Sequence, residues 1–229
     1  RGMTKRQRPK DGHPLPPAPP DPLDDLAVLR EIPPDLRGVE VRECRLADAD
    51  LTGRDAHGLQ LIESRVQGVD LARAVLRRAT LRDVVISGGD WANIDAAETI
   101  IRRVELRGLR LTGAVLAAAK LQDAYFIQCR LDLCSLRFAT LDRVRFEDCR
   151  MEEADFYEAA LNSVAFVDCD LSRATLAKAT FERCEMRGCE LGGINGADRL
   201  RGVTMPWLDI LRSAAVLADG VGVQILDED

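Results

Sequence analysis

An unbroken period of five dominates this sequence. From Leu36 to Leu191 every fifth residue is apolar, and the phase never shifts. With 46% of the chain hydrophobic, such a run of 32 positions would arise by chance with odds on the order of 10⁻¹¹. The run therefore reflects a repeated structural unit.

A period of five fits neither of the regular elements. Five residues rotate around an α-helix by about 140°, and in a strand successive fifth residues would alternate between the two faces. The chain must therefore turn once in every repeat, so that each repeat supplies a short extended side and a corner. Stacked repeats of this kind form a solenoid.

Several repeats carry a more specific pattern, which is a small residue, then Asp or Asn, then Leu or Phe, then two variable residues. It occurs as written at residues 49–51, 69–71, 154–156 and 169–171. In this respect the sequence resembles the pentapeptide-repeat family, over roughly residues 36–196. The resemblance implies an all-β fold, a right-handed, four-sided β-helix of about eight coils with about twenty residues in each.

All seven cysteines lie two residues before a central apolar position. They are Cys44, Cys129, Cys134, Cys149, Cys169, Cys184 and Cys189. In the family that this sequence resembles, the slot points inward and takes a small residue. We therefore expect small, buried, reduced side chains, and we weigh this above a metal or redox role because no histidine accompanies them.

The composition divides the chain into four segments. Residues 1–22 are basic and then dense in proline, which favours a disordered arm. Residues 23–35 are expected to cap the first coil, as one short helix within Asp21 to Ile32 or as an irregular lid. Residues 36–196 form the repeat. Residues 197–229 are expected to form a C-terminal helix and strand that serve as a cap or a dimerisation module.

The C-terminal segment departs from the period of five. Thr204 is a candidate N-cap, Pro206 is suited to the first turn, and an apolar face including Trp207 follows. We expect this short capping helix to end at Gly220. The alternation after it, at residues 221–225, predicts a final strand.

Charge and hydropathy limit the partners that we expect. A net charge of −6 and a pI near 5.2 argue against direct nucleic-acid binding. No run of about eighteen apolar residues and no signal-peptide pattern is present, so we expect a cytoplasmic protein without a membrane partner.

Stacking would gather the charged residues into columns. The position before the central residue holds, on successive coils, three acids, three arginines and two acids, from Asp50 to Glu190. These groups either form charged bands along one side, or they hydrogen-bond to neighbouring corners or make weak surface pairs. Acidic residues also concentrate in the C-terminal half, as a candidate interaction patch of Glu147, Asp148, Glu152, Glu153, Asp155, Glu158, Asp168 and Asp170.

No combination of residues typical of catalysis is evident. His13 lies in the proline-rich arm and His57 at a corner, and no phosphate loop, nucleophile elbow, zinc spacing or dinucleotide motif occurs. We therefore expect no enzyme, no cofactor and no metal. The predicted function is a scaffold that binds a protein partner, not identified by the sequence, through its solenoid faces.

An alternative function follows from the C-terminal end. The run at 201–203, the amphipathic helix and the run at 220–225 are similar to the ends of the quinolone-resistance pentapeptide proteins. That resemblance implies a DNA-mimicking modulator of DNA gyrase or topoisomerase IV, in which the acidic patch imitates phosphates. It also implies a homodimer whose contact includes Trp207, Leu208 and Leu211, whereas the same helix could instead only cap the last coil.

Overall fold

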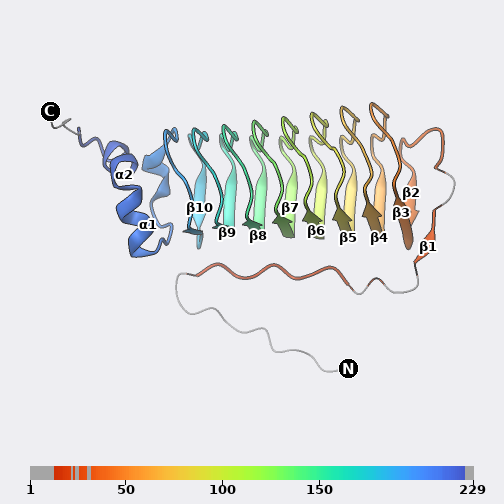
Figure 1. Cartoon of the computed structure of the whole chain (residues 1–229), viewed down its shortest axis with the longest axis horizontal. Helices are drawn as coiled ribbons and strands as arrows, with labels where there is room; N and C mark the ends of the chain where they lie inside the picture. The colour runs from red at the N-terminus through yellow and green to blue at the C-terminus, as the bar shows by residue number, and fades with distance from the viewer. Residues whose placement is uncertain (1–12, 22, 24–25, 30–31, 225–229) are drawn as a thin grey trace, which may run out of the picture.

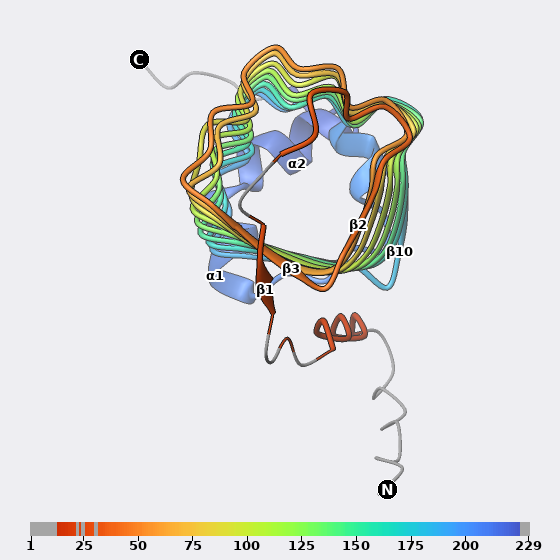
Figure 2. The same cartoon turned by 90° about the vertical axis from the view of Figure 1, so that its right-hand side faces the viewer.

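The repeat winds into a four-sided β-solenoid. The structure is a computed structural model, and it describes residues 13–21, 23, 26–29 and 32–224. Successive coils lie next to one another along one axis (Figure 1), and the view along that axis shows the four sides (Figure 2). The predicted β-helix of about eight coils, with short helices at its C-terminal end, is confirmed.

Parallel strands with a register of twenty residues build the longest part of each coil. Leu61 pairs with Leu81, for example, and Phe126 with Phe146. The strands are β1 (Ala27–Val28), β2 (Glu40–Arg42), β3 (Cys44–Ala47), β4 (Gln60–Gln67), β5 (Thr80–Ser87), β6 (Ile100–Arg107), β7 (Lys120–Ile127), β8 (Thr140–Glu147), β9 (Ala160–Val167), β10 (Thr180–Glu182) and β11 (Glu185–Arg187). Isolated bridges connect the remaining sides with the same register.

Each corner requires a left-handed backbone at the residue two positions after the central apolar one. Gly68, Gly88 and Gly108 have φ angles of 59°, 64° and 61°, which glycine adopts without steric cost. Asp83 and Arg103 adopt the same conformation, with φ angles of 56° and 51°. The hydrogen bonds between coils therefore stabilise a conformation that costs about 1–3 kcal/mol outside glycine.

The core is filled by the central apolar residues and by the small residues two positions before them. The rings of Phe126, Phe146 and Phe166 stack at centroid distances of 4.9 and 5.1 Å, so the aromatic column lies in the C-terminal half. All seven cysteines are buried and free of disulfides, as predicted. Burial raises the pKa of the Cys134 thiol to about 12, because a thiolate is poorly solvated there.

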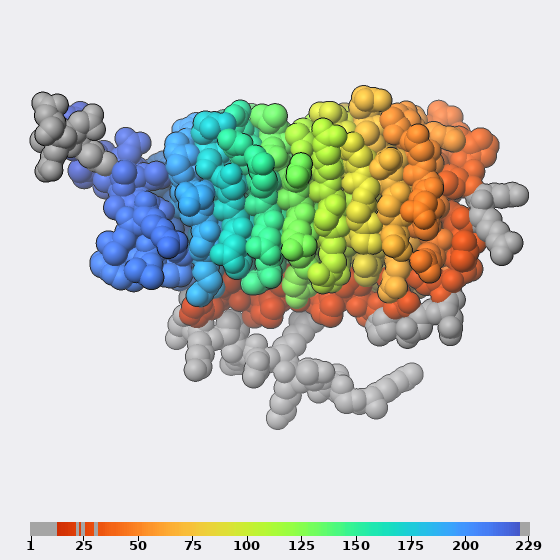
Figure 3. Space-filling view, viewed as in Figure 1, coloured from red at the N-terminus to blue at the C-terminus, as the bar shows by residue number. Residues whose placement is uncertain are grey.

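The described part of the proline-rich arm has a defined path, in contrast to the disorder that we expected for residues 1–22. Residues 13–21 run along the strands from β11 to β5 (Figure 1), and the space-filling view shows them as a narrow strip below the coils (Figure 3). Residues 1–12 and Pro22 lie outside the described residues. Proline density excluded a helix correctly, but it does not prevent an extended segment from packing on a surface.

The N-terminal cap is built from strand pairing. We expected a short helix or an irregular lid, and the described residues 23, 26–29 and 32–35 contain no helix. Instead, β1 pairs in parallel with β3, and Ile32 packs against the core. The first coil exposes unpaired backbone groups at its edge, and β1 satisfies some of them.

The C-terminal helix is broken into short pieces and begins later than predicted. A 3₁₀ helix, η1 (Ala197–Leu200), precedes α1 (Trp207–Arg212) and α2 (Ala214–Gly220). Thr204 is not the N-cap, because it bonds to the last coil through its backbone N–H, which donates to the Cys184 carbonyl at 2.9 Å. The end at Gly220 is confirmed, but residues 221–224 form no strand, and Ile225 lies outside the described residues.

Candidate protein-interaction surfaces

The eight residues of the predicted acidic patch do not share one side of the solenoid. Glu147 ends the strand β8, and Asp148 and Asp168 occupy the next corner on adjacent coils, with φ angles of 53° and 51°. Asp170 lies on the following side, in a bridge to Arg150. The other four are distributed over that side, the next corner, the fourth side and the last corner, and they are Glu152, Glu153, Asp155 and Glu158.

Basic side chains accompany five of these eight acids. Arg173 Nη2 lies 2.6 Å from Glu152 Oε1 and 2.8 Å from Glu153 Oε1, which brings these two acids together around one cation. The other pairs are Arg145–Glu147 at 2.8 Å, Arg137–Asp155 at 2.7 Å and Lys178–Glu158 at 3.0 Å. Most of the patch residues thus form surface ion pairs, and such pairs contribute about 0–1 kcal/mol each.

The charged column before the central residues forms as predicted, through bridges that connect Asp90, Arg110, Arg130, Arg150 and Asp170 in order. Acids of this column accept hydrogen bonds from backbone N–H groups two residues further along the chain. Asp170 Oδ1 accepts the backbone N–H of Ser172 at 3.0 Å, and Asp90 Oδ1 accepts that of Ala92 at 2.9 Å. The column therefore stabilises corners, which is the second of the two interpretations made from the sequence.

The predicted dimer contact is exposed in the single chain. Trp207, Leu208 and Leu211 have exposed fractions of 69%, 66% and 53%. The opposite side of α1 faces the solenoid with a polar residue, since the Gly188 N–H donates to the buried Asp209 carboxylate at 2.7 Å. The apolar face of α1 thus points away from the last coil.

Other side chains close the end of the core. Leu200 of η1 is buried, and Val203, Met205, Val216 and Leu217 pack against the core cluster. Capping is therefore carried out mainly by η1, α2 and the chain between η1 and α1. The cap and the exposed face of α1 are therefore separate surfaces, whereas the sequence pattern predicted a single helix with one apolar face.

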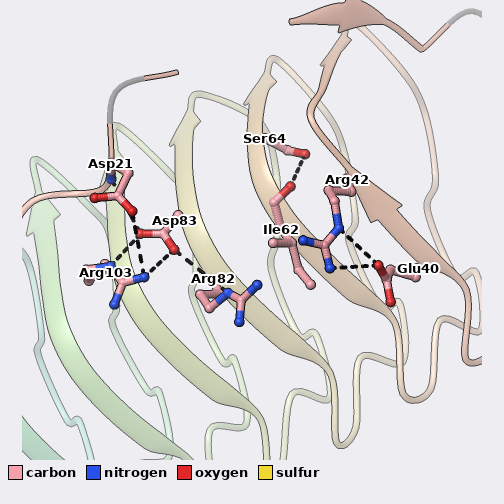
Figure 4. A network of polar contacts seen from close by, with 8 residues as sticks. All are labelled: Asp21, Glu40, Arg42, Ile62, Ser64, Arg82, Asp83 and Arg103. Atoms are coloured by element: carbon pink, nitrogen blue, oxygen red, sulfur yellow. Dashed lines mark hydrogen bonds and ion pairs between the residues drawn. The ribbon is translucent and has the colours of Figure 1, made fainter. Parts of the chain in front are cut away.

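A third surface, which the sequence reasoning missed, is the strand side that holds the arm. Asp83 of β5, whose side chain is 1% exposed, receives a bidentate pair of hydrogen bonds from Arg103 on the next coil. The backbone N–H of Asp21 donates to Asp83 Oδ1 at 3.4 Å. Figure 4 shows Asp83 between Asp21 of the arm and Arg103.

The same arrangement recurs two coils further along. Arg143 donates to both oxygens of Asp123 at 2.7 and 3.0 Å, and the Ala18 N–H donates to Asp123 Oδ1 at 3.0 Å. Burial favours the neutral form of Asp123, but these hydrogen bonds outweigh it and lower its pKa. The Tyr125 hydroxyl donates to the Pro17 carbonyl at 2.8 Å.

The described part of the arm reaches β11, where His13 Nδ1 lies 3.5 Å from Glu185 Oε2. Ala165 of β9 lies between the strands that carry Arg145 and Glu185, and it pairs with both residues. Only 6% of its surface is exposed. The signal that could have revealed this surface is the alternation of Asp and Arg at one corner position, at 83, 103, 123 and 143. The expectations drawn from the sequence did not include this column.

The described residues contain no cluster of His, Cys, Asp and Glu suited to a metal ion. Among their helices, none has the length and apolar character needed to cross a membrane. His57, the histidine of the repeat, is exposed.

Comparison with known proteins agrees with the repeat. Residues 99–175 and 119–196 match the family model of the pentapeptide repeat region. No curated protein sequence is significantly similar to the chain.

Solved structures of several repeat proteins align with this one. A trypsin-treated variant of QnrB1, a plasmid-mediated fluoroquinolone resistance protein, has 20% identity and a TM-score of 0.42 over 85% of this chain and 94% of its own. HetL, from the cyanobacterium Nostoc sp. strain PCC 7120 and involved in regulating heterocyst differentiation, has 22% identity and a TM-score of 0.31 over 76% and 93%. A pentapeptide repeat protein of the Arabidopsis thaliana thylakoid lumen has 18% identity and a TM-score of 0.30 over 61% and 69%.

Proposed function

Because the chain belongs to the pentapeptide-repeat proteins through residues 99–196, we propose that it is a non-enzymatic scaffold that binds another protein through the sides of its solenoid. The observation that carries this proposal is the strand side from β5 to β11, on which several coils hold an extended segment of polypeptide through side-chain contacts. A rigid ladder presents such contacts at regular intervals without rearrangement, which lowers the entropic cost of binding.

Affinity capture with one charge reversal on each side tests the scaffold function. Lys120, Arg107, Arg130 and Arg77 are exposed and lie on four different sides. We expect full-length protein to retain a partner from a lysate of the source organism in near-stoichiometric amount, and one of the four variants to Glu to lose it. Equal recovery by all four variants, or no stoichiometric partner, would contradict the proposal.

We further propose that the exposed face of α1 binds a second copy of the chain. Trp207, Leu208 and Leu211 form an exposed apolar face on a helix whose other side already contacts the solenoid. Exposed apolar surfaces of this kind mark protein contacts. A second copy is the favoured occupant because two such faces at the end of a rod are self-complementary around a two-fold axis.

The topoisomerase alternative is a separate proposal, and the pairing of the acids does not favour it. A DNA mimic presents unpaired negative charges, whereas five of the eight patch acids lie beside Arg or Lys. A gyrase supercoiling assay at stoichiometric protein, with and without a fluoroquinolone, tests it. Unchanged supercoiling and an unchanged drug effect would remove this alternative.

A further inference from the structure

The arm has a spacing of its own. Between Pro14 and Asp21 all residues are proline except Leu15, Ala18 and Asp21, which recur every third position. Proline has no backbone N–H, so only these three residues retain a donor in this stretch. A polyproline II helix has three residues per turn, and the three donors therefore lie on one side of it.

This spacing matches the spacing of the coils. One polyproline II turn rises about 9.3 Å, and two coils of a parallel β-solenoid rise about 9.6 Å. Ala18 and Asp21, one turn apart, donate to Asp123 and Asp83, which occupy the same corner position two coils apart. One turn of the arm thus has nearly the same length as two coils of the solenoid.

The acceptors are held in place independently of the arm. Each Asp is fixed by an arginine of the next coil, Asp83 by Arg103 and Asp123 by Arg143. Each arginine donates hydrogen bonds from two of its nitrogens to the two oxygens of the aspartate. The Oδ1 atom of each aspartate also accepts a backbone N–H of the arm. Because Asp and Arg alternate along the column, an acceptor appears once in every two coils.

The register extends beyond these two contacts. Two coils past Asp123 the corner position is Ser163, which is 1% exposed. By the same spacing, we expect the third donor, Leu15, to lie opposite it. The Tyr125 hydroxyl donates a hydrogen bond to the carbonyl of Pro17, which lies between Leu15 and Ala18 in the arm and is buried. Domains that recognise proline-rich segments also place aromatic side chains against the polyproline II helix.

We propose that the corner column of Asp83, Asp123 and Ser163, together with Tyr125, is a binding site for polyproline II segments with one non-proline residue in every three. Residues 13–21 are its resident ligand, and a partner segment with the same spacing displaces them. This inference rests on the proposed function, because it names the class of partner that one side of the scaffold binds.

The first test measures the arm in the full-length chain. Ala18→Pro removes one N–H and preserves the polyproline II conformation, whereas Ala18→Ser retains the donor. We expect the amide of Asp21 to exchange with solvent at least tenfold faster in Ala18→Pro than in the wild type, measured by NMR, and to be nearly unchanged in Ala18→Ser. Equal exchange in all three proteins would overturn the proposal.

The second test supplies the ligand separately. A fluorescein-labelled peptide with the sequence of residues 13–21 is titrated with full-length Ala18→Pro and with the wild type, and its anisotropy is recorded. We expect saturable binding to Ala18→Pro, at least tenfold weaker binding to the wild type because the tethered arm competes, and at least tenfold weaker binding of a peptide that carries proline in place of its alanine.

Site variants complete this test. In the Ala18→Pro background, Tyr125→Phe is expected to weaken peptide binding severalfold, and Ser163→Asp to strengthen it by adding a third acceptor. Absence of saturable binding, or equal binding of the peptide without the central N–H, would overturn the proposal. Neither result affects the capture experiment above, because that experiment scores partners on all four sides.

Discussion

At the scale of single residues, the inward slot tolerates only side chains that fit the coil spacing. Gly89 occupies this slot two residues before Trp91 and has a φ angle of 107°. A Cβ at this position would lie 2.2 Å from the Val69 carbonyl oxygen, which accepts the Trp91 Nε1–H at 2.9 Å. Glycine is thus required by close approach as well as by conformation.

Gly89→Ala is therefore expected to lower the free energy of unfolding by about 2–3 kcal/mol, through strain and displacement of the Trp91 hydrogen bond. Urea denaturation measures the effect. Gly108→Ala is the matched control, because Gly108 has a φ angle of 61° and a Cβ added there would meet no atom within 4 Å; it is expected to cost about 1–2 kcal/mol, which is the cost of the positive φ alone. Equal losses would contradict the steric argument.

A second prediction at this scale concerns pH. The pKa of Cys134 rises from 9.0 to about 12 on folding because of burial. A group that is harder to ionise in the folded chain stabilises it below the unfolded pKa, and this stabilisation is lost as the pH rises from about 9 toward 12. Between pH 9 and pH 11 we therefore expect the free energy of unfolding to fall more in the wild type than in Cys134→Ala, by up to about 2 kcal/mol.

Urea midpoints at pH 8, 9, 10 and 11 provide the measurement. Alanine is a suitable replacement because it fills the same slot elsewhere, as at Ala114 and Ala154, both fully buried. If the two proteins lose stability in parallel over this range, the Cys134 thiol does not ionise on unfolding as argued.

At the scale of elements, the sequence predicted best what depends on neighbouring repeats. The central residues, the inward cysteines and the glycines at the corners each meet the equivalent residue twenty positions away, so a local pattern determines their environment. The element bounds at both ends were predicted less well. There, β1 pairs with an open edge and α1 breaks at Ser213, and neither outcome follows from periodicity.

The candidate sites show the same division. The coil of each acidic residue followed from the register, but the eight acids did not gather on one side as a patch. Their pairing with Arg173, Arg137 and Lys178 depends on side-chain reach around corners. The path of the arm depends on residues far away in sequence, since Ala18 and Asp123 are 105 positions apart. Proline content alone indicated what the arm could not form, and it contained no information about where the arm would bind.

The α1 helix supports a prediction about assembly. Trp207→Ala is expected to convert the proposed dimer to a monomer, because the indole is the largest member of the exposed apolar face, with 69% of its surface accessible. Multi-angle light scattering over a range of concentrations measures the mass. Leu133→Ala, which alters an exposed apolar residue on a corner of the repeat, should leave the dimer intact. A monomeric wild type would end the proposal.

At the scale of the whole molecule, the solenoid behaves as a one-dimensional stack in which each coil contacts only its neighbours. Stability is then approximately a sum over coils and the interfaces between them, and no single coil is indispensable. The phase of the repeat matters more than the number of coils, because every core residue reaches the interior only at its place in the period.

Removal of residues 141–160, one whole coil, should therefore leave a folded rod. The next coil supplies the same inward residues at most positions, with Leu161, Val164, Phe166 and Cys169 replacing Leu141, Val144, Phe146 and Cys149. Phe126 would then stack directly on Phe166. We expect the far-ultraviolet circular dichroism per residue to be unchanged and the melting temperature to fall by only a few degrees, since one interface between similar coils is lost.

Removal of residues 141–143 alone provides the opposing case. This smaller deletion shifts the phase by three, so the central apolar residues of later coils no longer follow the earlier ones around the turn, and polar residues enter core positions at a cost of several kcal/mol. Thermal denaturation of the two variants beside the wild type gives a direct ranking. If the twenty-residue deletion is as destabilising as the three-residue one, stacking in register is not what holds this rod together.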